Sequence, residues 1–298
     1  MKLSKYVPSA RRARFAATSV TTLVALFSAG LLVALVSGAQ AAAKSVPLGT
    51  ADSFVVLAGS GITNTGPTTL NGDLGTFPTT SISGTGSLTV TGANHAGGTV
   101  TQGAKTDLVT AYNTAAGEGP TSPIAADLGG RTLTPGVYNS ASSIGLTGEL
   151  TLNAGGDPSA VFVFQAGSSL TTASASRITM VNGAQACNVF WQVGSSATLG
   201  TNSSFRGSIL ALTSITATTG ASITGRLLAR NGAVTLDTNT ITKPTCAAVT
   251  ATTATSTTAA TNTTAAAKKK AAAAKKKAAA PAARARARKA VRRAAFTG

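Results

Sequence analysis

The sequence predicts a mostly β protein in which short strands stack as the coils of a β-solenoid, with a single long helix. Three observations lead to this fold class. Consecutive segments repeat one order of apolar and polar residues, short apolar runs alternate with glycine-containing turns, and only residues 99–117 show helical spacing. Each repeat is too short to bury its apolar face alone, so the repeats are expected to stack on one another.

The repeat is clearest in the C-terminal half of this β-rich region. Phe205, Ile223 and Ile241 recur at intervals of 18 residues, and the apolar triplet 209–211 matches the triplet 227–229. A period near 18 residues with short strands is typical of one turn of a β-solenoid.

Each repeat contains a three-residue strand with threonine at its centre. Because side chains alternate along a strand, the flanking apolar residues are expected to point into the core and the threonine outward. Stacking places Thr198, Thr216 and Thr235 in one column, about 4.7–4.9 Å apart, and Thr171 aligns as a fourth member. The β-propensity of threonine alone can explain such a column. The scarcity of long charged side chains at the outward positions favours a binding surface instead.

A second set of threonines follows these strands and consists of Thr201, Thr219 and Thr238. Residues three apart face opposite sides of a straight strand, so both sets face outward only if a corner falls between them. Two residues beyond the first column the repeats carry Gly200, Thr218 and Asp237. An aspartate there either interrupts the order of the face or lies at its rim.

Residues 99–117 are predicted to form the long helix. Leu108, Val109 and Tyr112 recur at helical spacing, with alanines around them. Gly117 and Pro120 mark the end of the pattern.

Charge and composition divide the remaining chain. Of 25 Lys and Arg residues, 12 lie in residues 265–298 and 5 in the first 14, whereas residues 45–264 hold 7 basic and all 8 acidic residues. Residues 45–246 are therefore expected to form one nearly uncharged domain. Residues 247–264 are predicted to be a Thr/Ala-rich linker. Residues 265–298 are predicted to be a basic Ala/Lys/Arg-rich tail, disordered until it meets a polyanion.

Residues 1–41 are predicted to be a signal peptide, with a basic start, a long apolar stretch and a small-x-small cleavage pattern at 39–41. An uncleaved membrane anchor is the alternative. The protein is thus expected to be secreted or associated with the cell surface. In such a compartment Cys187 and Cys246 are expected to form a disulfide rather than two buried thiols.

No recognisable set of catalytic or metal-binding residues emerges. His95 is the only histidine, and neither a Gly-x-Ser-x-Gly elbow nor a Cys-x-x-Cys or His-Glu-x-x-His motif is present. Trp191 is expected in the core, and Arg206, Arg226 and Arg230 on a solvated surface. We therefore expect no enzyme activity, no metal, no cofactor and no small-molecule substrate. Nucleic acid is not expected as a partner, because the basic residues lie outside the domain.

Four long segments resemble the microbial ice-binding protein (antifreeze) family in the right order: 46–76, 127–143, 187–216 and 225–242. The resemblance as a whole covers essentially all of residues 46–246. The resemblance implies a right-handed, discontinuous β-solenoid of triangular cross-section, with the long helix packed alongside. It also implies that one flat face of the solenoid adsorbs to ice.

On this resemblance the outward threonines become candidates for an ice-binding face. The candidates are Thr171, Thr198, Thr201, Thr216, Thr218, Thr219, Thr235 and Thr238, joined by Ser60, Thr63 and Thr65 of the opening strand. The expected function is a secreted protein that binds ice crystals and inhibits their growth or recrystallisation. The alternative is a cell-surface adhesion or structural module, held to acidic wall polymers by the basic tail.

Overall fold

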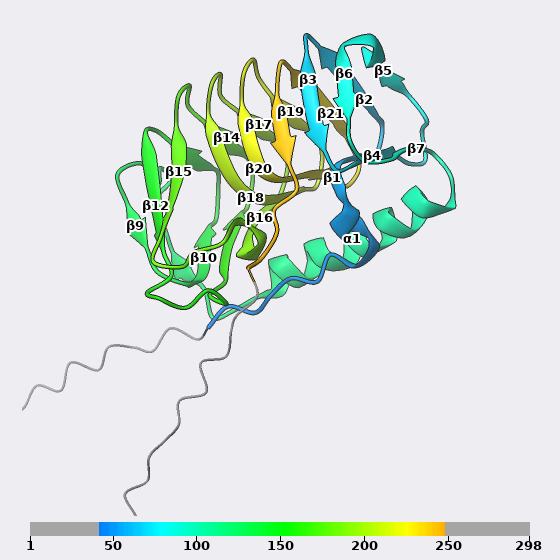
Figure 1. The fold of residues 1–298 in the computed structure, drawn as a ribbon. Coiled ribbons are helices and arrows are strands. Elements are labelled where there is room, and N and C mark those ends of the chain that lie inside the picture. The colour runs from blue at the N-terminus through cyan, green and yellow to red at the C-terminus, as the bar shows by residue number, and fades with distance from the viewer. Residues whose placement is uncertain (1–41, 248–298) are drawn as a thin grey trace, which may run out of the picture. The chain divides into compact units, whose positions relative to one another are not determined.

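The computed structural model describes residues 42–247. The predicted signal peptide 1–41, nearly all of the linker 247–264 and the whole tail 265–298 lie outside these residues. Within the described part of the chain, strands β1 to β22 form two parallel sheets, one of 15 and one of 7 strands, with one α-helix and three 3-10 helices. Figure 1 shows the strands stacked side by side as successive coils. No helix of the described residues is long and apolar enough to span a membrane.

Each complete coil passes through three strands, of which the middle one belongs to the 7-stranded sheet and the other two to the 15-stranded sheet. The first two C-terminal coils are β10 (Gly136–Ser140), β11 (Ile144–Leu146) and β12 (Glu149–Asn153), then β13 (Phe162–Ala166), β14 (Leu170–Thr172) and β15 (Arg177–Val181). The next three run through β16 (Val189–Val193), β17 (Ala197–Leu199), β18 (Ser204–Ala211), β19 (Ile215–Ala217), β20 (Ser222–Ala229), β21 (Ala233–Asp237) and β22 (Thr240–Thr242). The long strands β18 and β20 each end one coil and begin the next.

The N-terminal coils continue the stack beyond the last C-terminal coil. They consist of β1 (Phe54–Ala58), β2 (Gly61–Thr65), β3 (Thr68–Asn71), β4 (Asp73–Thr76), β5 (Ile82–Ser83), β6 (Leu88–Val90) and β7 (Asn94–Ala96). Strands β1, β2 and β3 pair with β20, β21 and β22. The other end of the stack is closed by the short strands β8 (Ser122–Pro123) and β9 (Thr132–Leu133). The predicted discontinuous solenoid is confirmed, while its right-handedness and triangular cross-section stay predictions.

The predicted repeat is the stacking register of the coils. Phe205, Ile223 and Ile241 lie directly above one another, and each is at most 1 % exposed. The triplet 209–211 pairs residue by residue with 227–229. Trp191 is buried as expected, and its ring stacks on that of Phe164 with centroids 3.9 Å apart.

Glycine allows the long strands to turn the corner between two layers of the solenoid. The first three residues of β18 alternate between half-buried and buried, and every residue from Gly207 onward is buried. Gly207 has a φ of 105°, and a Cβ on its neighbour Gly225 would lie 1.8 Å from the Gly207 carbonyl oxygen. Only a residue without a side chain fits at this bend.

The predicted helix is α1 (Thr99–Gly117), and its bounds are those expected from the sequence. It buries Leu108, Ala111 and Tyr112 against a layer of the solenoid that includes Phe190 and Leu228. Figure 1 shows α1 running along the stack. This layer includes β1, β10, β13, β16 and the second halves of β18 and β20, all in the 15-stranded sheet, so α1 leaves the 7-stranded sheet uncovered.

Each terminal segment of the domain is tied to the solenoid by one link. The predicted disulfide between Cys187 and Cys246 is confirmed, with the two Cα atoms 5.7 Å apart. The guanidinium of Arg226 on β20 pairs with the carboxylate of Asp52 in η1 (Gly49–Ser53), just before β1. The side chain of Arg226 is only 3 % exposed, so the expectation that this arginine lies on a solvated surface was wrong.

Candidate functional site

The 7-stranded sheet carries an unbroken outward column of threonines. Register places the following residues side by side, in stacking order: Gly145, Thr171, Thr198, Thr216, Thr235, Thr63 and Ser83. The predicted alignment of the first four threonines is thereby confirmed, and Thr63 joins them from the N-terminal coil. On β17, β19 and β21 the residues on either side of the threonine, such as Leu199 and Ile215, are at most 1 % exposed. We call this row the central column.

A row of serines runs beside the central column, and the sequence interpretation missed it. Its members stand two residues before the column residues and are Ser143, Ser169, Ser196 and Ser214. The hydroxyls of Ser143 and Ser169 lie 2.8 Å apart. The Ser196 hydroxyl accepts a hydrogen bond of 3.2 Å from the amide of Ser214. The Gly-Ser-Ser segments at 167–169 and 194–196 were the signal that could have revealed it.

The second predicted set of threonines lies at the corner that follows the 7-stranded sheet, and one of its members was misaligned. The amides of Asn202, Gly220 and Thr238, all at positive φ, donate to the carbonyls of Thr219, Asp237 and Thr65 in the adjoining coils. Thr238 is therefore equivalent to Asn202 and Gly220. The row that contains Thr201 and Thr219 continues with Asp237 and Thr65.

A one-residue difference in loop length explains the misalignment. The central triplets pair Ala217 with Leu236, an offset of 19, whereas the next strands pair Ser222 with Thr240, an offset of 18. The coil of β21 has thus lost the residue equivalent to Thr218. The sequence alone does not reveal this deletion, because Thr219 can be aligned with Asp237 at an offset of 18 or with Thr238 at an offset of 19.

Asp237 lies at the rim of the face, at the last residue of β21. Its carboxylate accepts hydrogen bonds from the hydroxyls of Thr219 and Thr238. The bond from Thr219, followed by that from Thr238, holds the pKa of Asp237 below its usual value. The carboxylate therefore stays charged at neutral pH and is occupied by neighbouring hydroxyls.

The remaining candidates take different places. Thr218 donates from its hydroxyl to the carbonyl of Leu199 at 2.7 Å, and Thr65 donates to that of Leu236 at 3.3 Å. Ser60 is exposed in the turn before β2, at the opposite rim from Asp237. The face thus has the central column in its middle, with Ser60 and the Thr219 row at its two edges.

Charge is nearly absent from this sheet. Among the residues of its seven described strands, Asp237 is the only charged one. Threonine is rigid about χ1 because it is β-branched, and the backbone ladder sets the spacing between rungs at about 4.7–4.9 Å. The surface is therefore a stiff, repetitive array of hydroxyl and methyl groups.

The amino-acid sequence of this domain is similar to those of known proteins. Residues 56–242 match the family model described as ice-binding-like. The chain belongs to this family. It is 51 % identical over 218 residues to an ice-binding protein of Nostoc sp. (strain HG1), covering 71 % of this chain and 80 % of that one. An ice-binding protein of Colwellia sp. is 37 % identical over 220 residues, covering 67 % of this chain and 85 % of its own.

Solved structures of ice-binding proteins agree with this family member in fold. One, from an Antarctic biological consortium, superposes with a TM-score of 0.67 and 47 % identity, covering 68 % of this chain and 92 % of that chain. Another, from the Antarctic ascomycete Antarctomyces psychrotrophicus, has a TM-score of 0.65 and 45 % identity, covering 67 % and 98 % of the two chains.

The other chemical features of this ice-binding-like domain lie away from the threonine face. Within residues 42–247 no group of three or more His, Cys, Asp or Glu side chains is arranged to hold a metal ion. His95 on β7 lies with its Nε2 atom 3.9 Å from the Asp73 carboxylate.

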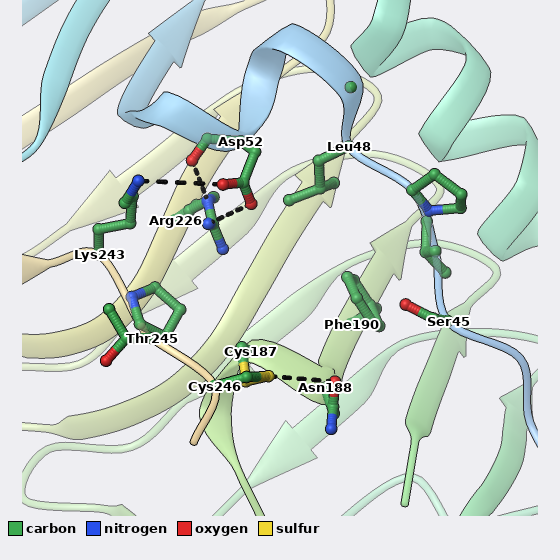
Figure 2. A pocket seen from close by; sticks show the side chains of 14 residues that line it. Ser45, Leu48, Asp52, Cys187, Asn188, Phe190, Arg226, Lys243, Thr245 and Cys246 are labelled. Carbon is green, nitrogen blue, oxygen red and sulfur yellow. Dashed lines mark hydrogen bonds and ion pairs between the residues drawn. A yellow bond between two sulfur atoms is a disulfide. The ribbon is translucent and has the colours of Figure 1, made fainter. Parts of the chain in front are cut away.

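A surface pocket of about 600 Å³ lies between the two ends of the domain. Figure 2 shows Leu48 and Phe190 on one side of it and the disulfide below. Its buried cation, Arg226, already donates to the Asp52 carboxylate, to the Asp52 carbonyl at 3.0 Å and to the Ser208 hydroxyl at 3.2 Å. The pocket thus lies between the first and last described segments of the chain, and Arg226 offers it no free cation for an anionic ligand.

Proposed function

We propose that this protein adsorbs to ice crystals through the outward face of the 7-stranded sheet and thereby inhibits ice growth or recrystallisation. The observation that carries the proposal is the central column, in which five threonines of five stacked coils stand in register in a chain of the ice-binding-like family. The relatives named above are ice-binding proteins, and this supports the same partner here.

The physical basis is the match between a repetitive protein surface and a repetitive solid. Threonine side chains held in one rotamer lose little conformational entropy when they become fixed at an interface. Hydroxyls at regular intervals hold first-shell water by hydrogen bonds, and the methyl groups between them leave gaps that water fills in the same repeat. An array of ordered water of this kind can merge with the surface layer of a crystal.

The near absence of charge strengthens this reading. Lysine and glutamate would carry mobile, strongly hydrated side chains that disturb an ordered layer of water. Their absence from the seven strands, apart from Asp237 at the rim, is unusual for a surface whose only role is solubility.

The test is a single outward substitution in the middle of the column. Thr216→Tyr places a large ring among the threonines without touching the buried residues on either side. We expect the protein concentration needed to inhibit ice recrystallisation to rise roughly tenfold, equivalent to about 1.4 kcal/mol of adsorption free energy. The measurement is an ice recrystallisation assay on the full chain.

Thr106→Tyr is the matched control, because Thr106 is an exposed threonine on α1, away from the sheet. Its inhibition should equal that of the unmodified protein. Unchanged inhibition in a folded Thr216→Tyr variant would remove this face from the proposal.

A further inference from the structure

A second ordered array of hydroxyls lies on the next layer of the solenoid, around the corner from the 7-stranded sheet. Four neighbouring strands carry the pattern hydroxyl, apolar, polar: 222–224, 240–242, 69–71 and 89–91. Register stacks their first residues as Ser222, Thr240, Thr69 and Thr89, and three of their third residues as Thr224, Thr242 and Asn71. Thr91 follows directly after β6, and its amide donates to the carbonyl of Leu70 at 2.9 Å, which continues the same register beside Asn71. We call these eight residues the second array.

The two rows of the second array have regular spacing in both directions. Along each strand the outward residues are two positions apart, about 6.6 Å, and neighbouring strands are about 4.7–4.9 Å apart. All eight side chains are exposed or half-exposed, whereas Ile223, Ile241 and Leu70 between them are 1 % exposed or less. The fourth apolar residue, Val90, is partly buried against the core. Asn71 donates to the hydroxyl of Thr242 at 3.0 Å, which fixes both side chains.

The packing of the fold does not require this composition. The same layer continues through β12, β15 and the start of β18, where the inward residues are again apolar but the outward ones include Glu149, Arg177 and Arg206. Glu149 and Arg177 form an ion pair of 2.6 Å. Charged outward residues therefore occupy one half of the layer and are absent from the other. The change coincides with the four strands of the second array.

Several classes of partner do not fit this surface. It has no basic side chain among its eight residues, as a polyanion would need, and no aromatic anchor, as a protein partner would need. Arg206 of the adjoining strand β18 donates to the Thr224 hydroxyl at the edge of the array, so its guanidinium already has a partner. A small-molecule ligand would need a concave pocket. None of the eight residues lines the pocket beside the disulfide or the smaller pocket next to it. A rigid, uncharged and repetitive array fits an extended solid with a repeat of its own.

The second array is also continuous with the proposed face. The chain passes directly from the end of β21 to β22 through residues 238–239, and from β2 to β3 through 66–67. The row that contains Thr219, Asp237 and Thr65 forms the corner between the two surfaces. Both surfaces therefore belong to the same coils, yet they are carried by different sheets.

We propose that the second array is a second ice-adsorbing surface, which meets crystal planes different from those that the central column meets. This inference rests on the proposed function and adds a second surface to it. Two arrays that lie on different sheets of one rigid solenoid allow the protein to bind growing ice in more than one orientation.

The test identifies the crystal planes that the protein covers. The full chain, fused to a fluorescent protein, is adsorbed to a single ice crystal of known orientation, and the labelled planes are recorded. We expect the unmodified protein to label two sets of planes. Thr216→Tyr should lose one set, and Thr240→Tyr should lose the other.

Two further variants keep the test decisive. Thr89→Tyr changes a different strand of the second array and should lose the same planes as Thr240→Tyr. If circular dichroism shows that one of the two variants folds poorly, the other still provides the test. Thr151→Tyr changes an outward threonine in the charged half of the same layer, and its pattern should equal that of the unmodified protein.

Unchanged labelling by folded Thr240→Tyr and Thr89→Tyr would overturn the second surface, and a loss of all planes in Thr216→Tyr would still uphold the proposed function. Absence of labelling by the unmodified protein would overturn the proposed function itself, and the second surface with it.

Discussion

Threonine contributes three things to these surfaces: a methyl group, a hydroxyl and a single stiff torsion. Valine would provide the methyl without the hydroxyl, and serine the hydroxyl with more freedom. In the central column Thr171, Thr198 and Thr216 hold all three properties at one rung each. Because the register of the backbone fixes the rungs, the side chains need little ordering when they meet a solid.

A substitution of Asp237 tests whether the charge at the rim of the face affects ice recrystallisation inhibition. Its carboxylate is bonded to Thr219 and Thr238 at the corner, outside the central column. We expect Asp237→Asn to keep ice recrystallisation inhibition within about twofold, a change well under 1 kcal/mol, because the charge lies at the edge. A large gain of activity on removing the charge would place Asp237 inside the face instead.

At this scale the sequence predicts the central column but not its neighbours. Thr198, Thr216 and Thr235 could be aligned because apolar residues flank each of them in a constant pattern. Thr238 could not be aligned correctly, because one missing residue in its coil shifts every later position by one. The serine row was not recognised, since its serines also fit ordinary turns.

At the scale of elements, helix α1 was predictable and its anchoring was not. Leu108, Val109 and Tyr112 mark its apolar stripe, and its bounds match the expectation. Helical spacing places Lys105 on this stripe, three residues before Leu108, and its ammonium donates to the carbonyl of Ala229 at 2.6 Å and to that of Arg230. A lysine at a helix position is ordinarily expected in solvent. Only the packing of α1 against β20 reveals this contact.

The buried Lys105 makes a prediction about pH. Burial, together with the nearby positive charge of Arg230, lowers the pKa of Lys105 from 10.5 to about 8. The unfolded chain therefore holds this proton more tightly than the folded protein between pH 8 and 10.5. The free energy of unfolding contributed by Lys105 should rise over that interval, by an amount on the order of 3 kcal/mol.

Lys105→Met provides the comparison, measured by urea unfolding at several pH values. The difference in stability between the unmodified protein and Lys105→Met should shift in favour of the unmodified protein as the pH rises from 8 to 10.5. Parallel pH profiles for the two proteins would show that Lys105 keeps an ordinary pKa in the fold.

At the scale of the whole molecule, the stack does not follow chain order. The coil of β1, β2 and β3 lies against the coil of β20, β21 and β22. Paired residues such as Val56 and Leu227 are about 170 positions apart in the sequence. The 18-residue period is visible only among the later coils, and the N-terminal coils diverge from it in loop length. The position of the N-terminal coils in the stack could therefore be predicted from the resemblance to a family, but not from the 18-residue repeat.

The contact between Asp52 and Arg226 predicts an asymmetry in how the N-terminal coil is held against the C-terminal coils. Asp52→Ala leaves a buried guanidinium without its carboxylate, which costs about 3 kcal/mol. Arg226→Met removes the buried charge and leaves Asp52, whose side chain is 58 % exposed, to be hydrated. Urea unfolding should therefore show a clearly larger loss of stability for Asp52→Ala. An equal or larger loss for Arg226→Met would contradict this account of the junction.

The central claim is that the 7-stranded sheet adsorbs to ice, and uptake into slowly growing ice tests it most directly. The full chain and Thr216→Tyr are mixed separately with a non-binding reference protein, and the fraction of each protein in the ice is measured. We expect the unmodified protein to concentrate in the ice and Thr216→Tyr to be taken up to a much smaller extent. Exclusion of the folded, unmodified protein to the same extent as the reference, or equal uptake of both forms, would contradict the account.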